Sequence, residues 1–486
     1  MYLSYALAAL AATGLTSAQE TVLGVYIFSR HGDRTAKSTP PANLTDLGYS
    51  EVFTSGTYFR NRYISSDASS RIHGMNSDLV KQSQIIASAP ADTVLQNSAL
   101  GFLQGLYPPV GNTLGSNTLR NGTTVQSPLN GYQLIPLQTV QTGTNSENSA
   151  WLQGSTNCAN AQISSNNYFQ SPEFNATSSA SQPLYDSVQP MVNRTFTPSQ
   201  TNFKNGYVIW DLLNVASIHN ASANLDALTP SVFNQLFHLA NTHEWNLAYN
   251  ATDPIRAITG AILADQVVTA LNTTITSAGK SKLNIQFGAY AGMLSFFGLA
   301  NLPAANPDFT GIPDYASTLT WELVTNATVS GTTFPSTDDI SVRFLFHNGT
   351  TSNTSQPVEY PLFGQSRSPL PWNDFVTSMA SFSIKSQADW CKACGNSTGV
   401  CSSESLDGSG DGGSSASATS KSGGGGGGGI SKAVAGVIGA MVTLAVILGV
   451  ELLIMLVAGL RLVRKKKLQR LQSPAGSADG IGHVKA

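Results

Sequence analysis

The stretch from Thr21 to Lys37 reads TVLGVYIFSRHGDRTAK and decides how the rest of the chain is interpreted. Its first half, through Phe28, is nearly all apolar and rich in β-branched and aromatic residues, which is typical of a buried strand. A histidine between two arginines, Arg30 and Arg34, follows at once. Such a position exposes side chains at the carboxyl end of a sheet. Packing does not require two cations there, whereas binding an anion does.

The residue types in this motif suit the transfer of a phosphoryl group. Arg30 and Arg34 offer planar donor forks that match phosphate oxygens, and Gly32 lets a ligand or backbone approach closely. Two flanking cations favour the neutral, nucleophilic form of His31. A neutral imidazole can attack phosphorus and pass the phosphoryl group to water. The alternative is a surface turn with a solvated Arg–Asp pair, which the preceding apolar strand disfavours.

The composition indicates an exported protein with a mildly acidic main body. The chain has 486 residues, of which 11% are charged, and this length allows one large domain or two smaller ones. Residues 461–486 contain seven basic residues and one acidic residue, so residues 1–460, with 19 basic and 27 acidic, carry a net charge of −8. This charge argues against broad nucleic-acid binding.

The N-terminal segment and the glycosylation motifs also predict export. Residues 1–18 resemble a signal peptide, with a short apolar stretch and small residues at Thr16 and Ala18, and we expect cleavage after Ala18. A buried first helix is the alternative. Asn-x-Ser/Thr motifs, which are individually weak signals, occur throughout the next four hundred residues: Asn43, Asn121, Asn175, Asn193, Asn220, Asn250, Asn272, Asn326, Asn348, Asn353 and Asn396.

The four cysteines are Cys158, Cys391, Cys394 and Cys401. In an oxidising compartment they are expected to form two disulfides, with three connectivities open. The CKAC stretch could also be a redox or zinc pair. We favour the structural interpretation because no second pair or nearby histidine completes a zinc site.

The C-terminal part predicts a membrane anchor. Residues 406–429 are a Gly/Ser-rich linker, and residues 430–460 form an apolar stretch long enough to cross a bilayer, with Glu451 inside it. The basic tail 461–486 predicts a single-pass type I orientation, with residues 19–405 outside the cytoplasm. The plasma membrane, the cell surface and the vacuole fit equally. We interpret the basic cluster as a stop-transfer signal rather than a site for anionic lipid.

Periodicity between these ends predicts an α/β domain with a large helical insertion. The polar stretch 112–182 is expected to be rich in loops. Strands are expected at 22–28, 206–210, 283–288 and 341–346, and helices over 91–107, 229–245 and 254–272. In the second of these helices, Thr229-Pro230 fits an N-cap followed by a first-turn proline.

The RHGDRT motif resembles the signature of the histidine acid phosphatases, the branch of the histidine phosphatase superfamily that includes phytases. Four further stretches agree in order over roughly residues 20–395: LTDLGYSEVFTSGTYFRNRY, ALGFLQGLYPP, HEWNLAYN with the following helix, and LPWNDFVTSMASFSIKSQADWCKAC. The resemblance implies an α/β core with a smaller, mainly helical domain. It also implies a phosphohistidine intermediate, an acid pH optimum, and no metal or other cofactor. By resemblance, His31 is the nucleophile, and Arg30 and Arg34 bind phosphate.

The chain departs from the family pattern at three places. Ala36 stands where a proline is usual, and this departure is minor. The stretch 85–99, which matches a segment that normally supplies another phosphate-binding arginine, contains no arginine. Tyr290 and Ala291 match a His-Asp pair in which histidine binds phosphate and aspartate protonates the leaving group.

Few other residues are candidates to replace that pair. We interpret His243-Glu244 as structural, because by order it matches a helix before the late strand. Asp33 is expected to orient the arginines of the motif. The remaining candidates are histidines that lack a motif: His73, His219, His238 and His347.

The sequence therefore supports two main hypotheses for residues 19–405. One is an acid phosphatase-like phosphomonoesterase of reduced activity, acting through a phosphohistidine. The other is an inactive pseudophosphatase that binds phosphate esters at the cell surface. A glycosylated wall or adhesion protein is a third, and it would make the RHGDRT match a coincidence. The oligomeric state and the identity of the ester stay open.

Overall fold

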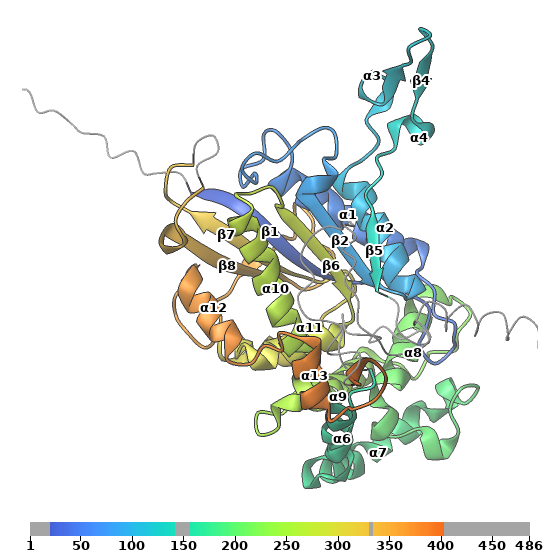
Figure 1. Ribbon diagram of the computed structural model, residues 1–486. Coiled ribbons are helices and arrows are strands. Elements are labelled where there is room, and N and C mark those ends of the chain that lie inside the picture. Colours follow the sequence, from blue (N-terminus) through green and yellow to red (C-terminus); the bar gives the residue numbers. More distant parts are fainter. Residues whose placement is uncertain (1–19, 141–155, 330–333, 403–486) are drawn as a thin grey trace, which may run out of the picture. The chain divides into compact units, whose positions relative to one another are not determined.

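An eight-stranded mixed sheet forms the centre of the structure, which is a computed structural model (Figure 1). It describes residues 20–140, 156–329 and 334–402. The strand order is β10-β8-β7-β1-β6-β2-β5, and β9 pairs with β8. The strands are β1 (Thr21–Arg30), β2 (Ile85–Pro90), β5 (Leu137–Val140), β6 (Leu283–Gly288), β7 (Thr318–Thr325), β8 (Ile340–His347), β9 (Val358–Glu359) and β10 (Leu370–Pro371). The predicted signal peptide 1–18, linker 406–429, membrane helix 430–460 and tail 461–486 lie outside the described residues.

The register of the sheet fixes which chain segments meet at the end of β1. β1 runs parallel to β6 and antiparallel to β7, and Arg30 is opposite Gly288. Because β1 and β6 end at the same edge, the residues that follow each strand lie side by side. The loop after Arg30 therefore faces the start of the helix that follows β6.

Helices cover both faces of the sheet, and the side chains of β1 alternate between them. Tyr26 and Phe28 pack into the core with α10, α11 and α12, whereas Val25 and Ile27 pack into the core with α1 and α2. The helices are α1 (Asp46–Tyr63), α2 (Thr93–Leu106), α3 (Gly111–Leu114), α4 (Pro128–Gly131), α6 (Ala159–Asn167), α7 (Pro172–Val192), α8 (Gly206–His219), α9 (Pro230–Ala248), α10 (Ile258–Thr276), α11 (Tyr290–Leu299), α12 (Trp372–Ala380) and α13 (Gln387–Cys394).

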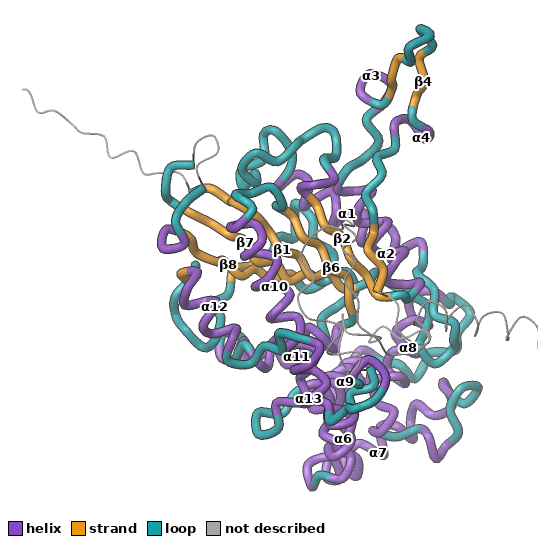
Figure 2. Tube along the Cα trace, viewed as in Figure 1, coloured by secondary structure: helices purple, strands orange, loops and turns teal. Residues whose placement is uncertain are grey.

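A mainly helical part, α6 to α9, extends from the carboxyl end of the sheet (Figure 2). It has a hydrophobic cluster of its own, which includes Phe174, Tyr185 and Phe203. The predicted α/β architecture with a smaller helical domain is confirmed. A short two-stranded sheet, β3 (Ser116–Thr118) with β4 (Thr124–Gln126), is separate from the main sheet.

The strands expected at 22–28, 283–288 and 341–346 are confirmed, as are the three expected helices. Thr229 caps α9 by accepting a bond from the N–H of Val232. The strand expected at 206–210 is wrong, because GYVIW begins α8. The run is short enough for either structure, and the buried residues Ile209 and Leu213 that follow at four-residue spacing fit a helix.

The expectation of loops over 112–182 is wrong for its second half. From Ala159 onward the chain forms α6 and most of α7. Many Ser and Asn residues conceal the helical pattern there, and Ser171 caps α7 through its hydroxyl.

One described helical stretch, Pro254–Thr276, is long and apolar enough to cross a membrane. Most of this stretch is α10, whose residues Leu263, Val267 and Leu271 are buried in the core beside the sheet. Its apolar composition therefore reflects a buried position in the domain.

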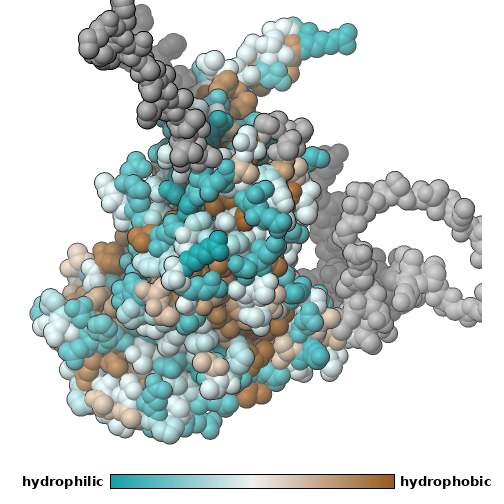
Figure 3. All heavy atoms as spheres, turned by 90° about the vertical axis from the view of Figure 1, so that its left-hand side faces the viewer, coloured by the Kyte–Doolittle hydropathy of each residue, from teal (hydrophilic) through white to brown (hydrophobic). Residues whose placement is uncertain are grey.

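Two disulfides resolve the open connectivity. Cys158 bonds to Cys394, and Cys391 bonds to Cys401. All four residues are buried in one small cluster, which confirms the structural interpretation of CKAC. The first bond ties α13 to the start of α6, 236 residues away. Figure 3 shows one face of the molecule, where hydrophilic side chains are interspersed with hydrophobic ones.

Candidate active site

The RHGDRT loop is buried at the carboxyl end of β1. Arg30, His31 and Arg34 are 3%, 0% and 0% exposed. Gly32 explains how the loop fits between the sheet and α1: a Cβ on it would lie 2.2 Å from the carbonyl oxygen of Gly48. Only a residue without a side chain allows this approach. The motif histidine is thereby held in a fixed position.

One hydrogen bond defines the tautomer of the histidine. Nδ1 of His31 lies 2.8 Å from the carbonyl oxygen of Gly32. Since a carbonyl can only accept, Nδ1 carries the proton. In the neutral ring Nε2 then holds a lone pair, which is the form required of a nucleophile.

Two tyrosine rings hold the first arginine of the motif. The Cζ atom of Arg30 is 4.5 Å from the ring centre of Tyr315 and 4.9 Å from that of Tyr290. Arg30 also donates from Nη1 to the carbonyl oxygen of Pro313. Its Nε is buried without a hydrogen-bond partner among the described residues, and this donor is suited to an anion.

The second arginine forms a buried ion pair. Nη1 of Arg34 lies 3.1 Å from Oδ1 of Asp211, and both side chains are fully buried. Nη2 of Arg34 donates to the hydroxyl of Tyr207 at 3.1 Å. Tyr207 and Asp211 are four residues apart and therefore share one face of α8. The misassigned strand is thus the helix that supplies the partners of Arg34.

Asp33 does not have the role expected for it. Its Oδ1 lies 2.6 Å from Nε2 of His219 and also accepts a bond from the hydroxyl of Thr45. The carboxylate that orients Arg34 is instead that of Asp211. His219, which has no sequence motif, therefore joins α8 to the motif loop.

Tyr290 and Ala291 lie in the first turn of α11, which follows β6. The Tyr290 hydroxyl donates to Oε2 of Glu244 at 2.7 Å. The other oxygen of Glu244 is 2.8 Å from Nδ1 of His243, whose Nε2 is 3.0 Å from the carbonyl oxygen of Lys204. The interpretation of His243-Glu244 as structural is therefore incomplete, because Glu244 reaches the substituted position.

Glu244 is held as an anion. Burial raises its pKa, but hydrogen bonds from His243 and Tyr290, the charge of His243 and that of Lys37 together lower the pKa below its ordinary value. Lys37 lies 5.5 Å from the ring centre of Tyr290. No sequence motif marks Lys37, although it is only six residues beyond His31.

A second carboxyl group beside the loop behaves in the opposite way. Oε2 of Glu51, on α1, accepts the backbone N–H of Asp33 at 2.7 Å. Burial raises its pKa to about 7, with smaller contributions from the charges of Asp33 and Asp314, whereas the bond from Asp33 and the charge of Arg30 lower it. Glu51 therefore changes charge near neutral pH.

This shift predicts a pH-dependent stability. Because the folded protein binds the Glu51 proton more tightly, the stabilisation is complete below pH 4.5 and is lost as the pH rises through about 7. Glu51→Gln should remove this loss, which we expect to amount to about 1–2 kcal/mol after allowance for partial exposure. Urea unfolding at pH 5 and pH 8 measures it. The exposed Glu173→Gln serves as the control, and parallel pH profiles for wild type and Glu51→Gln would contradict the assignment.

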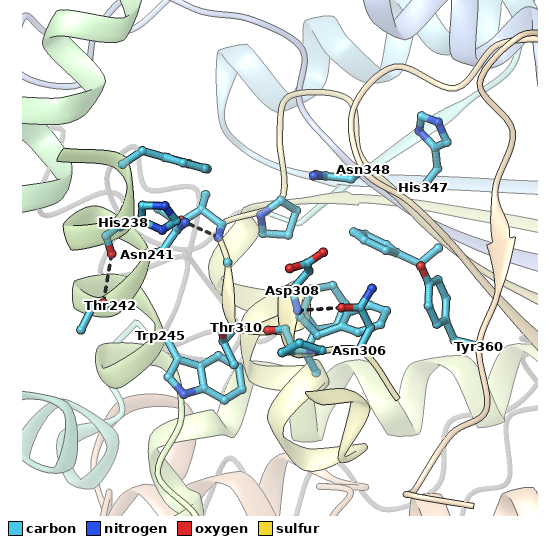
Figure 4. A pocket seen from close by; sticks show the side chains of 18 of the residues that line it. His238, Asn241, Thr242, Trp245, Asn306, Asp308, Thr310, His347, Asn348 and Tyr360 are labelled. Carbon is cyan, nitrogen blue, oxygen red and sulfur yellow. Dashed lines mark hydrogen bonds between the residues drawn. The ribbon is translucent and has the colours of Figure 1, made fainter. Parts of the chain in front are cut away.

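A cavity of about 820 Å³ lies beside α9 and the end of β8 (Figure 4). Aromatic side chains such as Trp245 and Tyr360 line it, together with His238 and His347. Among the described residues its lining contains no lysine or arginine, so the cavity does not suit a phosphate group. Pro313 connects this cavity to the motif, because it lines the cavity and its carbonyl oxygen accepts the hydrogen bond from Arg30.

The described residues contain no cluster of side chains that could bind a metal ion. Within residues 20–140, 156–329 and 334–402, no three histidine, cysteine or acidic side chains come together to hold a metal ion. The chemistry available at the motif is that of a buried imidazole between two guanidinium groups, with a lysine nearby. This arrangement can bind a phosphoryl group and accept it covalently.

Comparison with known proteins identifies the family. The family model of the histidine phosphatase superfamily (branch 2) matches residues 39–347. The match covers more than half of the chain, so the chain belongs to this superfamily. It begins just after the RHGDRT motif, and it includes both Tyr290 and Ala291.

Solved structures show the same fold. Hafnia alvei phytase in its apo form matches with a TM-score of 0.51 and 14% identity, over 78% of this chain and 98% of its own. The phytase from Klebsiella sp. ASR1 matches with a TM-score of 0.51 and 11% identity, over 75% and 97%. The phytase from Citrobacter braakii matches with a TM-score of 0.50 and 12% identity, over 77% of this chain and 99% of its own. No curated protein sequence matches the chain significantly.

Proposed function

We propose that this chain is an acid phosphatase-like phosphomonoesterase that acts through a phosphohistidine at His31. The observation that carries the proposal is the bond from Nδ1 of His31 to the Gly32 carbonyl. It gives Nε2 the lone pair in a buried site flanked by Arg30 and Arg34. Membership of the histidine phosphatase superfamily supports a phosphatase-type reaction.

The two half-reactions follow from these groups. Arg30 and Arg34 bind the phosphoryl oxygens and stabilise the charge that develops in the transition state. Nε2 of His31 attacks phosphorus, and the ester oxygen leaves with the electron pair of the P–O bond. Water then attacks the phosphohistidine and releases inorganic phosphate. The stacked rings of Tyr315 and Tyr290 keep Arg30 in place during both steps.

The turnover rate should be lower than the family pattern would allow. By the family resemblance, Tyr290 and Ala291 match the phosphate-binding histidine and the proton-donating aspartate. Loss of a general acid costs about 10²–10⁴-fold in rate. Reduced activity is therefore part of the proposal.

Trapping the intermediate tests this function. The full-length protein is incubated with phosphate-labelled p-nitrophenyl phosphate at pH 5.5 and quenched in alkali, in which phosphohistidine is stable. We expect acid-labile label on the peptide that contains His31. Absence of label during measurable turnover, or label on another residue, contradicts the phosphohistidine route.

A pseudophosphatase is the second candidate function. The observation that favours it is the carboxylate of Glu244, which accepts a hydrogen bond from Tyr290, whose ring centre lies 4.9 Å from Cζ of Arg30. A fixed negative charge at this place opposes a phosphate dianion in the transition state. This candidate predicts saturable binding of a phosphate ester by calorimetry, with no released phosphate and no labelled enzyme.

We further propose that the domain works outside the cytoplasm as part of a single-pass type I membrane protein. The support is the signal-like segment 1–18, the apolar residues 430–460 and the basic tail 461–486. Two disulfides in the domain fit an oxidising compartment. The partners would then be a phosphomonoester and the membrane.

A further inference from the structure

The carboxyl groups around the motif determine which esters can be cleaved. An alkyl alcohol is a poor leaving group unless a proton reaches its oxygen as the P–O bond breaks. At the family's donor position, the second residue of α11, this chain has Ala291. A methyl group cannot supply a proton. A donor would have to come from another carboxylic acid near His31.

The first two nearby carboxylates are committed to other partners. Asp211 pairs with Arg34 at 3.1 Å and also accepts the backbone N–H of Lys37 at 2.8 Å. Asp33 bonds to His219 at 2.6 Å. Each of these carboxylates therefore already accepts a hydrogen bond from another group of the protein.

The third carboxylate, Glu244, is ionised. It accepts hydrogen bonds from Tyr290 at 2.7 Å and from His243 at 2.8 Å. The phenol of Tyr290 directs its proton to this carboxylate.

Two carboxyl groups remain among the described residues near the motif. Oδ1 of Asp314 accepts the backbone N–H of Tyr315 at 2.8 Å. Oε2 of Glu51 accepts the backbone N–H of Asp33 at 2.7 Å.

We propose that the site selects phosphate monoesters whose leaving groups are stable as anions, such as aryl phosphates, over alkyl phosphates. This inference rests on the proposed function. Nε2 of His31 forms the P–N bond, and the P–O bond breaks with its electron pair going to the phenolate. In this proposal Glu51, which holds a proton at pH 5.5 because its pKa is about 7, stays bonded to the Asp33 N–H and does not protonate the leaving group. The phenolate takes its proton from solvent.

A leaving-group series on the full-length protein tests the inference. Values of kcat/KM are measured at pH 5.5 for substituted phenyl phosphates and for glycerol 2-phosphate. We expect kcat/KM to fall steeply as the pKa of the alcohol rises. Glycerol 2-phosphate should be about 10²–10⁴-fold slower than p-nitrophenyl phosphate, the range that a general acid supplies.

Two variants at one position provide the matched comparison. Ala291→Asp should raise kcat/KM for glycerol 2-phosphate at least about tenfold and flatten the series, since it restores an acid. Ala291→Asn introduces a side chain of nearly the same size as aspartate but without the acid. The dependence of kcat/KM on the pKa of the leaving alcohol should therefore stay steep. A gain in both variants overturns the inference, because it would reflect shape rather than proton donation.

The remaining outcomes separate this inference from the proposed function. Equal rates for alkyl and aryl esters, lost in His31→Ala, overturn the leaving-group selection but leave the function intact. The dependence of kcat/KM on the pKa of the leaving alcohol could be shallow in the wild type and steep in Glu51→Gln. That result would assign proton donation to Glu51 and would also overturn the leaving-group selection. No His31-dependent turnover of any ester refutes the function itself.

Discussion

Replacing His31 with alanine is expected to lower kcat/KM for p-nitrophenyl phosphate by about 10⁴-fold or more, to the uncatalysed background. Two groups between Arg30 and Arg34 could form a covalent phosphoryl intermediate, the imidazole of His31 and the carboxylate of Asp33. Oδ1 of Asp33 is bonded to His219 and Thr45, which favours the imidazole. Its Nδ1 bond to Gly32 serves to aim Nε2. Without the ring, the arginines can still bind phosphate, but no imidazole nitrogen is present to attack phosphorus. Steady-state release of p-nitrophenol measures the loss.

The control for this prediction is His73→Ala. His73 also precedes a glycine, but it lies outside any strand or helix and is partly exposed. Its replacement should leave kcat/KM within about twofold. Because His31 is fully buried, His31→Asn is included as a variant with less loss of volume, and circular dichroism confirms folding. Retained turnover in a folded His31→Asn protein would rule out the nucleophile role.

The parts of the fold that the sequence predicts are those with local signals. β1 is an unbroken apolar run that ends in a charged motif, and both features can be read within seventeen residues. The strand expected at 283–288 is apolar in the same way, and the structure pairs it with β1 so that Arg30 is opposite Gly288. The match of Tyr290 to the family pattern rests instead on the resemblance, because no local signal joins it to a motif about 260 residues away.

The partners of the motif have no local signal. Asp211 and Glu244 belong to helices α8 and α9, and neither residue differs in its sequence surroundings from an ordinary helical acid. Only the folded chain brings them 3.1 Å from Arg34 and 2.7 Å from Tyr290. The stretch GYVIW illustrates the difficulty, since five apolar and aromatic residues fit a strand or a helix equally. Disulfide pairing was likewise open until the chain was folded.

The electrostatics of the site connect the departures from the family pattern. Arg34 is paired with Asp211, Asp33 is bonded to His219, and Glu244 is bonded to His243. A phosphate ester must therefore compete with Asp211 for Arg34, whereas Nε of Arg30 has no partner among the described residues. We expect this competition to lower affinity, as the proposed phosphatase of reduced activity requires.

Asp211→Ala is expected to reduce the free energy of unfolding by about 3–5 kcal/mol, because it leaves the buried guanidinium of Arg34 without a counter-charge. Both side chains are 0% exposed, and Asp211 also accepts the N–H of Lys37. Asp211→Asn keeps an acceptor for that N–H but removes the charge. Its free energy of unfolding should therefore lie between those of the wild type and Asp211→Ala. Urea unfolding followed by tryptophan fluorescence gives all three values, and the exposed Asp226→Ala should change stability by less than about 0.5 kcal/mol. A loss below about 1 kcal/mol in Asp211→Ala would mean that water or phosphate already neutralises Arg34, and that the pair does not hold the motif loop against α8.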